Sequence, residues 1–314
     1  MRKILVNDGI ETSGKVLLET AGFSLDMNKI AQEDLVKKLN EYDVICVRSA
    51  TKVRKAEIDA SPNLKIIARG GVGLDNIDVA YAQEKGIKVI NTPAASSRSV
   101  AELAFAHIFS LARFLNHSNK IMHTKGGEMF NELKKAYAKG IELEGKTIGI
   151  VGLGRIGQEA AKIAIGLGMN VLGYDPYVKS IAVNIGSKQY HTLATVEGTS
   201  MENLLKNSDI ITIHVPGLDK PVLSEGEFAI MKKGTMVINI ARGGIIEENA
   251  LLKALSDGTV SAAGLDVFVG EPTPKQEILS HPNISLTPHI GASTNEAQEK
   301  IGEELARQII DFFA

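Results

Sequence analysis

The sequence predicts an α/β protein with two domains, each a parallel sheet flanked by helices. Short apolar runs alternate with helical patterns through most of the chain, which is typical of parallel strands joined by helices. The chain has 314 residues, more than one hydrophobic core usually serves. A glycine-rich turn between an apolar run and a helical pattern, at residues 152–157, begins the larger of the two sheets.

The first and smaller domain is predicted to consist of residues 1–95 and 292–314, with a flavodoxin-like sheet. The pattern predicts strands at residues 3–7, 44–47, 65–68 and 88–90, and helices at residues 14–21, 31–40 and 77–85. A last helix is predicted from Asn295 to the end, opened by the capping box Ser293-x-x-Glu296. Because this helix follows the whole second sheet, we expect it to pack on the first domain.

The second domain is predicted to consist of residues 96–291. Its first helical pattern, residues 97–115, is apolar around much of its circumference, so we expect it to be buried against its own domain and against a second subunit. The pattern does not decide whether the polar, lysine-rich segment 117–144 is helical. The apolar runs then predict six strands, at residues 147–151, 171–174, 210–214, 236–240, 261–266 and 284–287.

Helices are predicted between those strands. A helical pattern covers residues 158–167, and the capping boxes Thr199-x-x-Glu202 and Ser224-x-x-Glu227 open two further helices. Residues 176–198 have no clear pattern. Six strands with intervening helices are typical of a doubly wound, Rossmann-like dinucleotide fold.

Composition excludes several classes of partner. The net charge of −2 gives no electrostatic reason to expect nucleic acid or an anionic membrane surface. The single cysteine, Cys46, lies in an apolar run and is expected to be a core residue in a reducing compartment. The sequence has no run of about 20 apolar residues, and its N-terminus does not look like a signal peptide. We therefore expect a cytoplasmic protein.

Each glycine of the turn has a mechanical explanation. Gly152 allows the tight turn off the strand, Gly154 lets the backbone approach a pyrophosphate, and Gly157 lets the helix pack closely on the sheet. The N–H groups and positive dipole end of the new helix then face the phosphates. Arg155 and Ile156, inside the motif, are counted with the glycines as cofactor-binding residues.

An acidic residue completes the dinucleotide pattern. Asp175 lies eighteen residues beyond Gly157, where its carboxylate can accept hydrogen bonds from the adenosine ribose. A 2′-phosphate there would meet a negative charge, so NAD is expected rather than NADP. The alternative is an ordinary βαβ unit with a glycine-rich turn, which leaves Asp175 unexplained.

Three ionisable residues follow strands of the second domain, where ligands of parallel sheets bind. His289 can exchange a proton near neutral pH, and Glu271 can fix the tautomer of that imidazole. Arg242 can grip a carboxylate in bidentate fashion. A hydride transfer from a 2-hydroxy acid needs these three groups. No His or Cys cluster has the spacing of metal ligands, so no metal is expected.

Alternatives remain open for two residues. Glu271 could be a solvated loop acid. His214 also follows a strand, but Pro216 two residues later favours a backbone turn under the adenine or ribose over a proton-transfer role.

These motifs resemble those of the D-isomer-specific 2-hydroxyacid dehydrogenase family over essentially the whole chain. They are GLGRIG with YDP (residues 152–157 and 174–176), ARGG (241–244), GLDVF (264–268), GEP (270–272) and TPHIGAST (287–294). The resemblance implies NAD as cofactor and a catalytic set of Arg242, Glu271 and His289. It places Asp266 near the nicotinamide amide, and it implies that the other cofactor-binding residues after the strands are His214, Val215, Pro216, Ala241 and Gly291.

Within that family, the first domain is most similar to the branch that oxidises D-3-phosphoglycerate, through VRSATKV (residues 47–53) and ARGGVGLDNID (residues 68–78). The resemblance implies that Arg48 and Arg69 hold the phosphate of the substrate, and that the backbone after Arg69 holds its carboxylate. Both arginines end predicted strands, and paired cations suit a phosphate. The alternative is that they are strand-end charges in solvent. The implied substrate-binding residues are Arg48, Ser49, Arg69, Val72 and Gly73.

The expected reaction is NAD-dependent oxidation of D-3-phosphoglycerate to 3-phosphohydroxypyruvate, the first step of serine biosynthesis. Val72 departs from the threonine that some members use on the phosphate, and a further cation would come from Lys134 or Lys135 of a partner subunit. We expect a short form without the C-terminal regulatory domain of larger members. Feedback inhibition by serine is therefore not expected.

Two other functions are weighed. In the same class, the protein could be a glyoxylate or hydroxypyruvate reductase. In a different class, it could be an NAD-sensing, corepressor-like binding protein, although the sequence has no disordered tail or basic patch. We expect a homodimer, with a tetramer as the alternative.

Overall fold

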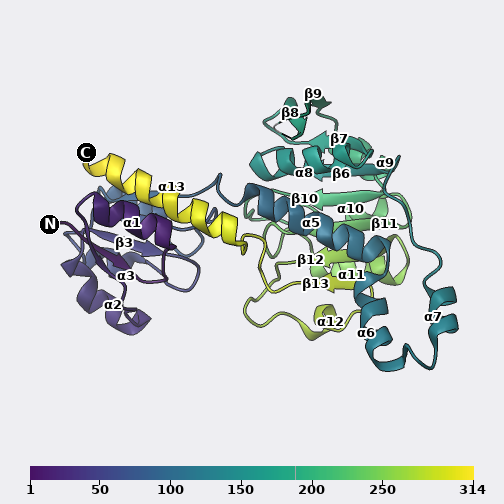
Figure 1. The fold of residues 1–314 in the computed structure, drawn as a ribbon, viewed down its shortest axis with the longest axis horizontal. Coiled ribbons are helices and arrows are strands. Elements are labelled where there is room, and N and C mark those ends of the chain that lie inside the picture. The colour runs from purple at the N-terminus through teal and green to yellow at the C-terminus, as the bar shows by residue number, and fades with distance from the viewer. Residues whose placement is uncertain (188) are drawn as a thin grey trace. The chain divides into compact units, whose positions relative to one another are not determined.

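The computed structural model describes residues 1–187 and 189–314, and the chain divides into two compact units. The first unit comprises Met1–Ser99 and Ala292–Ala314, and the second comprises Val100–Gly291. Each has a parallel sheet covered by helices and apolar clusters of its own (Figure 1). The α/β fold class predicted from the alternating pattern is confirmed.

The first unit contains a five-stranded parallel sheet in the flavodoxin-like order β2-β1-β3-β4-β5. Its strands are β1 (Lys3–Val6), β2 (Ser24–Asp26), β3 (Val44–Val47), β4 (Ile66–Arg69) and β5 (Lys88–Asn91). Its helices are α1 (Thr12–Thr20), α2 (Gln32–Lys38), α3 (Lys55–Asp59), α4 (Val79–Glu84) and α13 (Asn295–Phe313), with a 3-10 helix η1 (Leu39–Glu41). The pattern misses β2 because it has three half-buried residues and no apolar run.

Alternate residues of these strands face two apolar clusters, one on each side of the sheet. In β3, Ile45 and Val47 belong to one cluster, while Val44 and Cys46 belong to the other, which includes residues of α1 and α13. Cys46 is thus the core residue that its apolar run predicts. Burial raises the pKa of its thiol to about 12.

Helix α13 lies along α1 and contacts β4 and β5. The two helices meet at Gly14 and Gly302, where a Cβ on Gly14 would overlap the carbonyl group of Gly302. The N-cap of α13 is Thr294, whose hydroxyl accepts a hydrogen bond from the Ala297 amide at 3.1 Å. The capping box predicted from Ser293 is therefore wrong, because the N-cap lies one residue later, and Ala297 at the N3 position has no carboxylate to return the bond.

The second unit contains a six-stranded parallel sheet in the doubly wound order β13-β12-β11-β10-β6-β7. Its strands are β6 (Thr147–Val151), β7 (Asn170–Tyr174), β10 (Ile210–Ile213), β11 (Thr235–Asn239), β12 (Val260–Leu265) and β13 (Ile284–Leu286). All six predicted strands are confirmed to within one residue at each end.

Short helices join these strands. They are α8 (Arg155–Gly166), α9 (Met201–Asn207), α10 (Glu225–Ala229), α11 (Glu248–Ser256) and α12 (Gln276–Leu279). The capping box predicted at Ser224 is confirmed, since Glu227 accepts a hydrogen bond from the Ser224 amide at 2.9 Å. The box predicted at Thr199 is wrong by one residue, because the hydroxyl of Ser200 accepts from the Asn203 amide and caps α9. No helix within residues 1–187 and 189–314 is long and apolar enough to cross a membrane.

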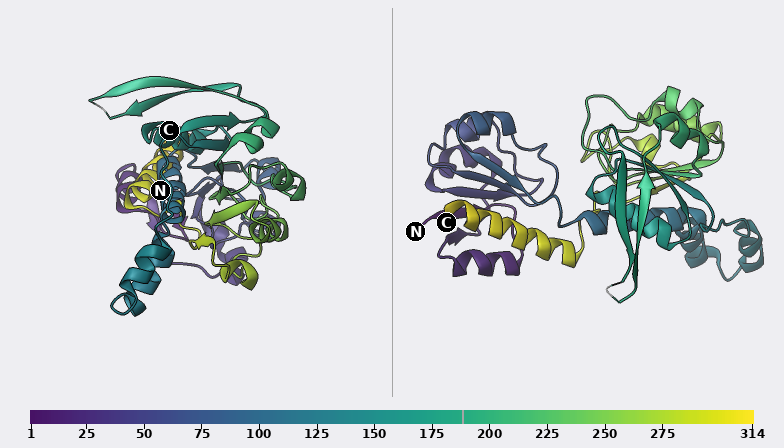
Figure 2. Two further views of the ribbon diagram at one scale, coloured as in Figure 1. Left: turned by 90° about the vertical axis from the view of Figure 1, so that its right-hand side faces the viewer. Right: turned by 90° about the horizontal axis from the view of Figure 1, so that it is seen from above.

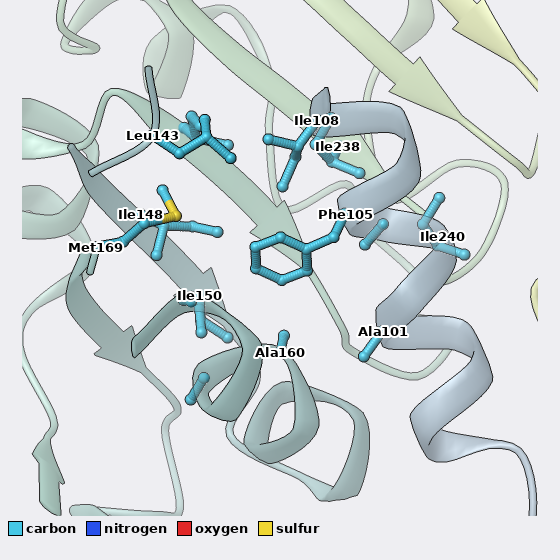
Figure 3. Packing of buried hydrophobic residues seen from close by; sticks show 14 of the residues in the cluster. Ala101, Phe105, Ile108, Leu143, Ile148, Ile150, Ala160, Met169, Ile238 and Ile240 are labelled. Carbon is cyan, nitrogen blue, oxygen red and sulfur yellow. The ribbon is translucent and has the colours of Figure 1, made fainter. Parts of the chain in front are cut away.

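Helix α5 (Ser97–Ala112) covers one face of the sheet of the second unit. Phe105 and Ile108 point into a cluster with Ile148 and Ile150 of β6 (Figure 3). The predicted helix runs three residues further than the observed one. It ends earlier because Phe114 takes a left-handed conformation with φ of 55°. Helices α6 (Leu115–Lys125) and α7 (Phe130–Ala136) follow in the segment that the pattern leaves open.

The stretch without a clear pattern contains a hairpin, β8 (Ser180–Gly186) and β9 (His191–Glu197), drawn as long teal strands in Figure 2. Ile181, Val183 and Val196 face inward and join the core that includes α8. Ser180, Ala182 and Asn184, which alternate with the inward residues of β8, face solvent. The hairpin is therefore an amphipathic cover for α8 that the sequence analysis misses.

Candidate active site

The glycine-rich turn joins β6 to α8 as its motif predicts. Gly152 has φ of 95°, in the left-handed region that favours glycine, and a Cβ there would lie 2.5 Å from the carbonyl oxygen of His214. A Cβ on Gly157 would overlap the carbonyl oxygen of Gly152, so the helix can approach the turn only without a side chain. The N-cap of α8, Gly154, provides no side-chain cap. The first amides of α8 are thus suited to bind the phosphates of a dinucleotide.

Asp175, directly after β7, ties this turn to the next strand. Its Oδ2 accepts a hydrogen bond from the Leu153 amide at 2.9 Å, and its Oδ1 accepts from the amides of Tyr177 and Val178 at 2.8 and 3.2 Å. An ionised carboxylate has about four lone-pair sites, so a ribose hydroxyl can still donate to it. The residues present therefore fit NAD, and the negative charge of Asp175 opposes a 2′-phosphate.

His214, after β10, is buried beneath the glycine turn. Its Nε2 lies 3.0 Å from the hydroxyl of Thr212, and its Nδ1 is buried without a hydrogen-bond partner among the described residues. Burial lowers the pKa of this imidazole to about 4. A ring that is neutral at pH 7 and closed off from solvent is suited to support the turn, which favours the backbone role over proton transfer. Val215 and Pro216 follow it in a segment that leads away from the strand.

The structure brings His289 and Glu271 together. Nδ1 of His289 lies 2.7 Å from Oε2 of Glu271, and half of the imidazole side chain is exposed. The other carboxylate oxygen, Oε1, accepts a hydrogen bond from the Phe268 amide at 2.8 Å, so Glu271 is held on both sides. This arrangement leaves Nε2 of His289 for a reacting group. Glu271 is therefore placed as an anchored partner of the histidine.

The backbone of His289 is in a conformation that L residues rarely adopt. Its φ is 54°, and its amide donates to the carbonyl oxygen of Asp266 at 2.9 Å. The buried carboxylate of Asp266 accepts from the amides of Ile290 and Gly291 at 2.8 and 2.9 Å, and from the hydroxyl of Thr287 at 2.6 Å. Such strain persists only where the surroundings over-determine the conformation, and it clusters at functional sites.

Arg242 follows β11, the strand next to β12. Its Nη1 donates to the Ala241 carbonyl oxygen at 2.7 Å, while the side chain of Asn239 brackets the turn by bonding the Ala241 amide and the Arg242 carbonyl. Gly243 lies so close to the backbone of Phe268 that any Cβ would overlap it. The turn that carries Arg242 therefore packs on the segment that leads to Glu271.

Two residues that the sequence analysis misses help to hold the pair. Thr287 bonds Asp266, and Glu248, buried in the first turn of α11, accepts from the Val269 amide at 2.9 Å. Lys275 lies 3.5 Å from the other oxygen of Glu248. The predicted elements do not include a helix at residues 248–256, so no sequence signal points to Glu248.

The predicted substrate residues lie in the first unit. Arg48 follows β3, and its guanidinium bonds the side chains of Gln298 and Glu11, the latter at 3.3 Å. Arg69 ends β4, with its guanidinium against Gly71. Val72 presents no polar side chain, and its carbonyl oxygen accepts from Asn91 at 2.7 Å. Arg48 is therefore not a strand-end charge that contacts only solvent, because the Glu11 carboxylate forms an ion pair with it.

The loop that carries Arg48 and Ser49 is fixed by two side chains that the sequence analysis misses. Oδ2 of Asp8 accepts from the amides of Arg48 and Thr51 at 2.8 and 3.0 Å. The side-chain amide of Asn76, three residues beyond Gly73, donates to the carbonyl oxygens of Arg48 and Thr51 at 2.7 and 2.6 Å.

Within residues 1–187 and 189–314, no group of three or more His, Cys, Asp or Glu side chains is arranged to hold a metal ion.

Comparisons with known proteins identify the family of the chain. Residues 105–291 match the family model described as D-isomer specific 2-hydroxyacid dehydrogenase, NAD binding domain. The chain is 42% identical to the D-3-phosphoglycerate dehydrogenase of Methanocaldococcus jannaschii, over 98% of this chain and 57% of that protein. It is 42% identical to the hydroxypyruvate reductase of Thermotoga maritima, over 98% of this chain and 97% of that protein. The chain thus spans little more than half the length of the first relative.

Solved structures show the same architecture. The apo D-mandelate dehydrogenase of Rhodotorula graminis superposes with a TM-score of 0.85 at 26% identity, over 98% of this chain and 93% of that one. The two curated relatives differ in the substrate that their names give. The comparisons therefore agree on the family but not on the substrate.

Proposed function

The chain belongs to the D-isomer specific 2-hydroxyacid dehydrogenase family and carries its NAD-binding domain, and from that premise we propose that it oxidises D-3-phosphoglycerate to 3-phosphohydroxypyruvate. That reaction is the first step of serine biosynthesis. The observation that carries the proposed chemistry is the 2.7 Å hydrogen bond between His289 and Glu271. The substrate is supported by Arg48 and Arg69 in the first unit, and by the similarity to a D-3-phosphoglycerate dehydrogenase.

His289 is proposed to move the proton. When bound, NAD supplies the acceptor for the hydride that leaves the hydroxyl-bearing carbon. Nε2 of His289 takes the hydroxyl proton as the carbonyl group forms, and returns it when the reaction runs as a reduction. Glu271 holds Nδ1 at 2.7 Å, and its negative charge then lies beside the imidazolium that results and stabilises it.

Arg242 is proposed to orient the substrate. A guanidinium has five N–H donors in a planar fork, a geometry that suits a bidentate grip on a carboxylate. The positive charge also stabilises negative charge on the reacting oxygen. Because the turn that carries Arg242 packs on the Phe268 backbone, the main chain of Arg242 is held in place.

Hydroxypyruvate reduction is the second candidate, and one observation favours it. Glu11 lies 3.3 Å from Arg48, where its charge opposes a doubly negative phosphate. A substrate without a phosphate would leave this ion pair intact. The hydroxypyruvate reductase of Thermotoga maritima also matches this chain over nearly its whole length.

A substrate panel tests the proposal. We would measure kcat/KM for D-3-phosphoglycerate and D-glycerate with NAD, and for 3-phosphohydroxypyruvate, hydroxypyruvate and glyoxylate with NADH. We expect D-3-phosphoglycerate to be preferred over D-glycerate, and 3-phosphohydroxypyruvate over hydroxypyruvate and glyoxylate. Arg48→Ala and Arg69→Ala should raise KM for the phosphorylated acids alone. No preference for them, with turnover of hydroxypyruvate or glyoxylate, selects the second candidate. NADH binding without turnover of any 2-hydroxy acid selects the corepressor-like alternative.

A further inference from the structure

A buried histidine outside the proposed catalytic set lies beneath the turn that carries His289. His107 of α5 is only 3% exposed. Its Nδ1 lies 2.8 Å from the hydroxyl of Ser285 in β13, and its Nε2 lies 3.0 Å from the hydroxyl of Thr287, which follows that strand. Ser285 and Thr287 are two residues apart and so present their hydroxyls on the same face. Both ring nitrogens are therefore bonded to one short segment.

The neighbouring strand provides room for the imidazole. Gly264 of β12 pairs with Ser285 of β13. A Cβ on Gly264 would lie 2.7 Å from Cβ and 3.0 Å from Cγ of His107, closer than side-chain atoms normally approach. The absence of a side chain at Gly264 is thus a condition for the ring to reach both hydroxyls. A buried niche of this shape fits a flat, polar ring.

The hydrogen bonds can run in only one direction when the imidazole is neutral. The hydroxyl of Thr287 donates its one proton to Oδ1 of Asp266 at 2.6 Å, so it must accept from Nε2–H of His107. Nδ1 is then an acceptor, and Ser285 donates to it. Burial lowers the pKa of His107, against a smaller opposing effect of Asp266, which agrees with a neutral ring. The chain of donors runs from Ser285 through His107 and Thr287 to Asp266.

The chain ends on the residue that holds the strained turn. The carboxylate of Asp266 binds the amides of Ile290 and Gly291, and its carbonyl oxygen binds the amide of His289. His289 keeps a left-handed φ of 54° because these bonds fix the backbone on either side of it. The orientation of Asp266 depends in turn on Thr287, whose hydroxyl is fixed by His107.

We propose that His107 is a positioning residue: through Thr287 and Asp266 it fixes the turn at residues 287–291 and so holds the imidazole of His289 against Glu271. The inference rests on the proposed catalytic role of His289. His107 touches no reacting atom in this arrangement. Its function is to supply one donor and one acceptor at fixed points in a place from which solvent is excluded.

Two substitutions separate this role from simple packing. His107→Phe keeps a flat ring and removes both polar atoms, whereas His107→Gln keeps an acceptor and a donor on one flat amide. We expect kcat of His107→Phe to fall about tenfold, since a misplacement of about 1 Å near reacting groups costs up to about 10²-fold. NADH affinity, measured by fluorescence titration, should fall less than kcat, although Asp266 and Gly291 are predicted to bind the cofactor. His107→Gln should recover most of kcat. A packing role predicts instead that Phe, which fills the niche better, performs as well as Gln.

A second measurement does not depend on turnover. In wild-type protein with ¹⁵N-labelled histidine, the ring signals of His107 should be those of the neutral Nε2–H tautomer. The Nδ1–H tautomer, or a folded His107→Phe variant with wild-type kcat while His289→Ala is inactive, overturns the inference. Wild-type activity in His289→Ala removes the proposed catalytic role, and the inference with it. Circular dichroism and thermal melts of both His107 variants establish that they are folded.

Discussion

The proposed chemistry depends on a contact between residues that are eighteen positions apart in the chain, His289 and Glu271. We expect His289→Ala to lower kcat/KM by at least about 10²-fold, the usual scale of general acid–base assistance. Glu271→Gln should lower kcat less, because an amide can still accept from Nδ1 but cannot stabilise the imidazolium charge. Glu277→Gln, an exposed acid on α12, is the matched control and should behave as wild type. A wild-type rate in His289→Ala would remove this residue from the mechanism.

Glu11 provides a residue-level test of the substrate. Its carboxylate lies 3.3 Å from Arg48, so it competes with any phosphate that this arginine binds. Glu11→Gln should lower KM for 3-phosphohydroxypyruvate by no more than about fivefold, since exposed ion pairs are typically worth up to about 1 kcal/mol. KM for hydroxypyruvate should not change. Glu19→Gln, on helix α1 that begins directly after Glu11 and paired with Lys15, is the control. An equal effect on both substrates would show that Arg48 binds no phosphate.

His214 makes stability depend on pH. Burial lowers its pKa from 6.5 to about 4, so the folded state resists a proton that the unfolded chain takes up. The contribution of neutral His214 to the free energy of unfolding is fully present above about pH 6.5. It is lost as pH falls from about 6.5 to about 4, and the total loss is about 3 kcal/mol. Urea unfolding of His214→Asn between pH 7 and 4 should therefore show a shallower loss of stability than wild type. His123→Asn, exposed on α6, should keep the wild-type slope.

Sequence reasoning can single out candidate residues by their position after a strand. His289, Glu271 and Asp175 are of this kind, because a parallel sheet gathers the residues after its strands at one edge. It fails for Thr287, Glu248 and His107. Their partners lie far away in the chain, as with His107 and Ser285, and neither residue type is unusual in its own segment. The roles of such residues become visible only when the fold brings the partners together.

At the scale of elements, the apolar runs locate the strands well because burial on both faces makes parallel strands continuously hydrophobic. The pattern misses the hairpin of β8 and β9, because only one of its faces is buried and its outer face is mixed in character. It also misses the break after α5. Phe114 takes the left-handed conformation without the glycine or proline that usually marks such a site.

The contact between α1 and α13 gives a prediction about stability. Gly14 lies against the backbone of Gly302, so Gly14→Ala must push the helices apart. We expect a loss of about 1–3 kcal/mol in the free energy of unfolding, the usual cost of overpacking. Gly166→Ala at the end of α8 is the matched control, since its Cβ meets open space and the change should add up to about 1 kcal/mol. If Gly14→Ala is as stable as wild type in urea, the close packing of the two helices is wrong.

At the scale of the whole molecule, the alternation of strands and helices suffices to predict parallel sheets, because parallel strands need a crossover connection. Periodicity does not say which strands are neighbours. The doubly wound order of the second sheet is predicted instead from six strands with intervening helices and a glycine-rich turn, which together are typical of a dinucleotide fold. Surface composition adds a further feature. Large apolar side chains are exposed along the consecutive helices α5, α6 and α7, among them Phe109, Leu115, Met122 and Phe130.

This apolar surface leads us to expect a homodimer. Figure 1 shows α6 and then α7 following α5 along the chain, and several exposed large apolar side chains on consecutive helices are typical of protein interfaces. The same helix α5 is already buried on its other side, through Phe105 and Ile108. A second copy of the chain would cover the exposed side with an identical surface, as a two-fold interface requires.

Sedimentation velocity tests the expectation. The wild-type protein should sediment at twice the 33.7 kDa mass of the chain, and the double variant Leu115→Glu, Phe130→Glu should sediment as a monomer, because two buried charges without partners oppose association. Leu193→Glu, equally exposed but on β9, should leave the mass unchanged. A tetramer that the double variant reduces to dimers would assign these helices to one of two interfaces. A monomeric wild type contradicts the expectation, since the apolar side chains of α5–α7 would then face solvent in the native state.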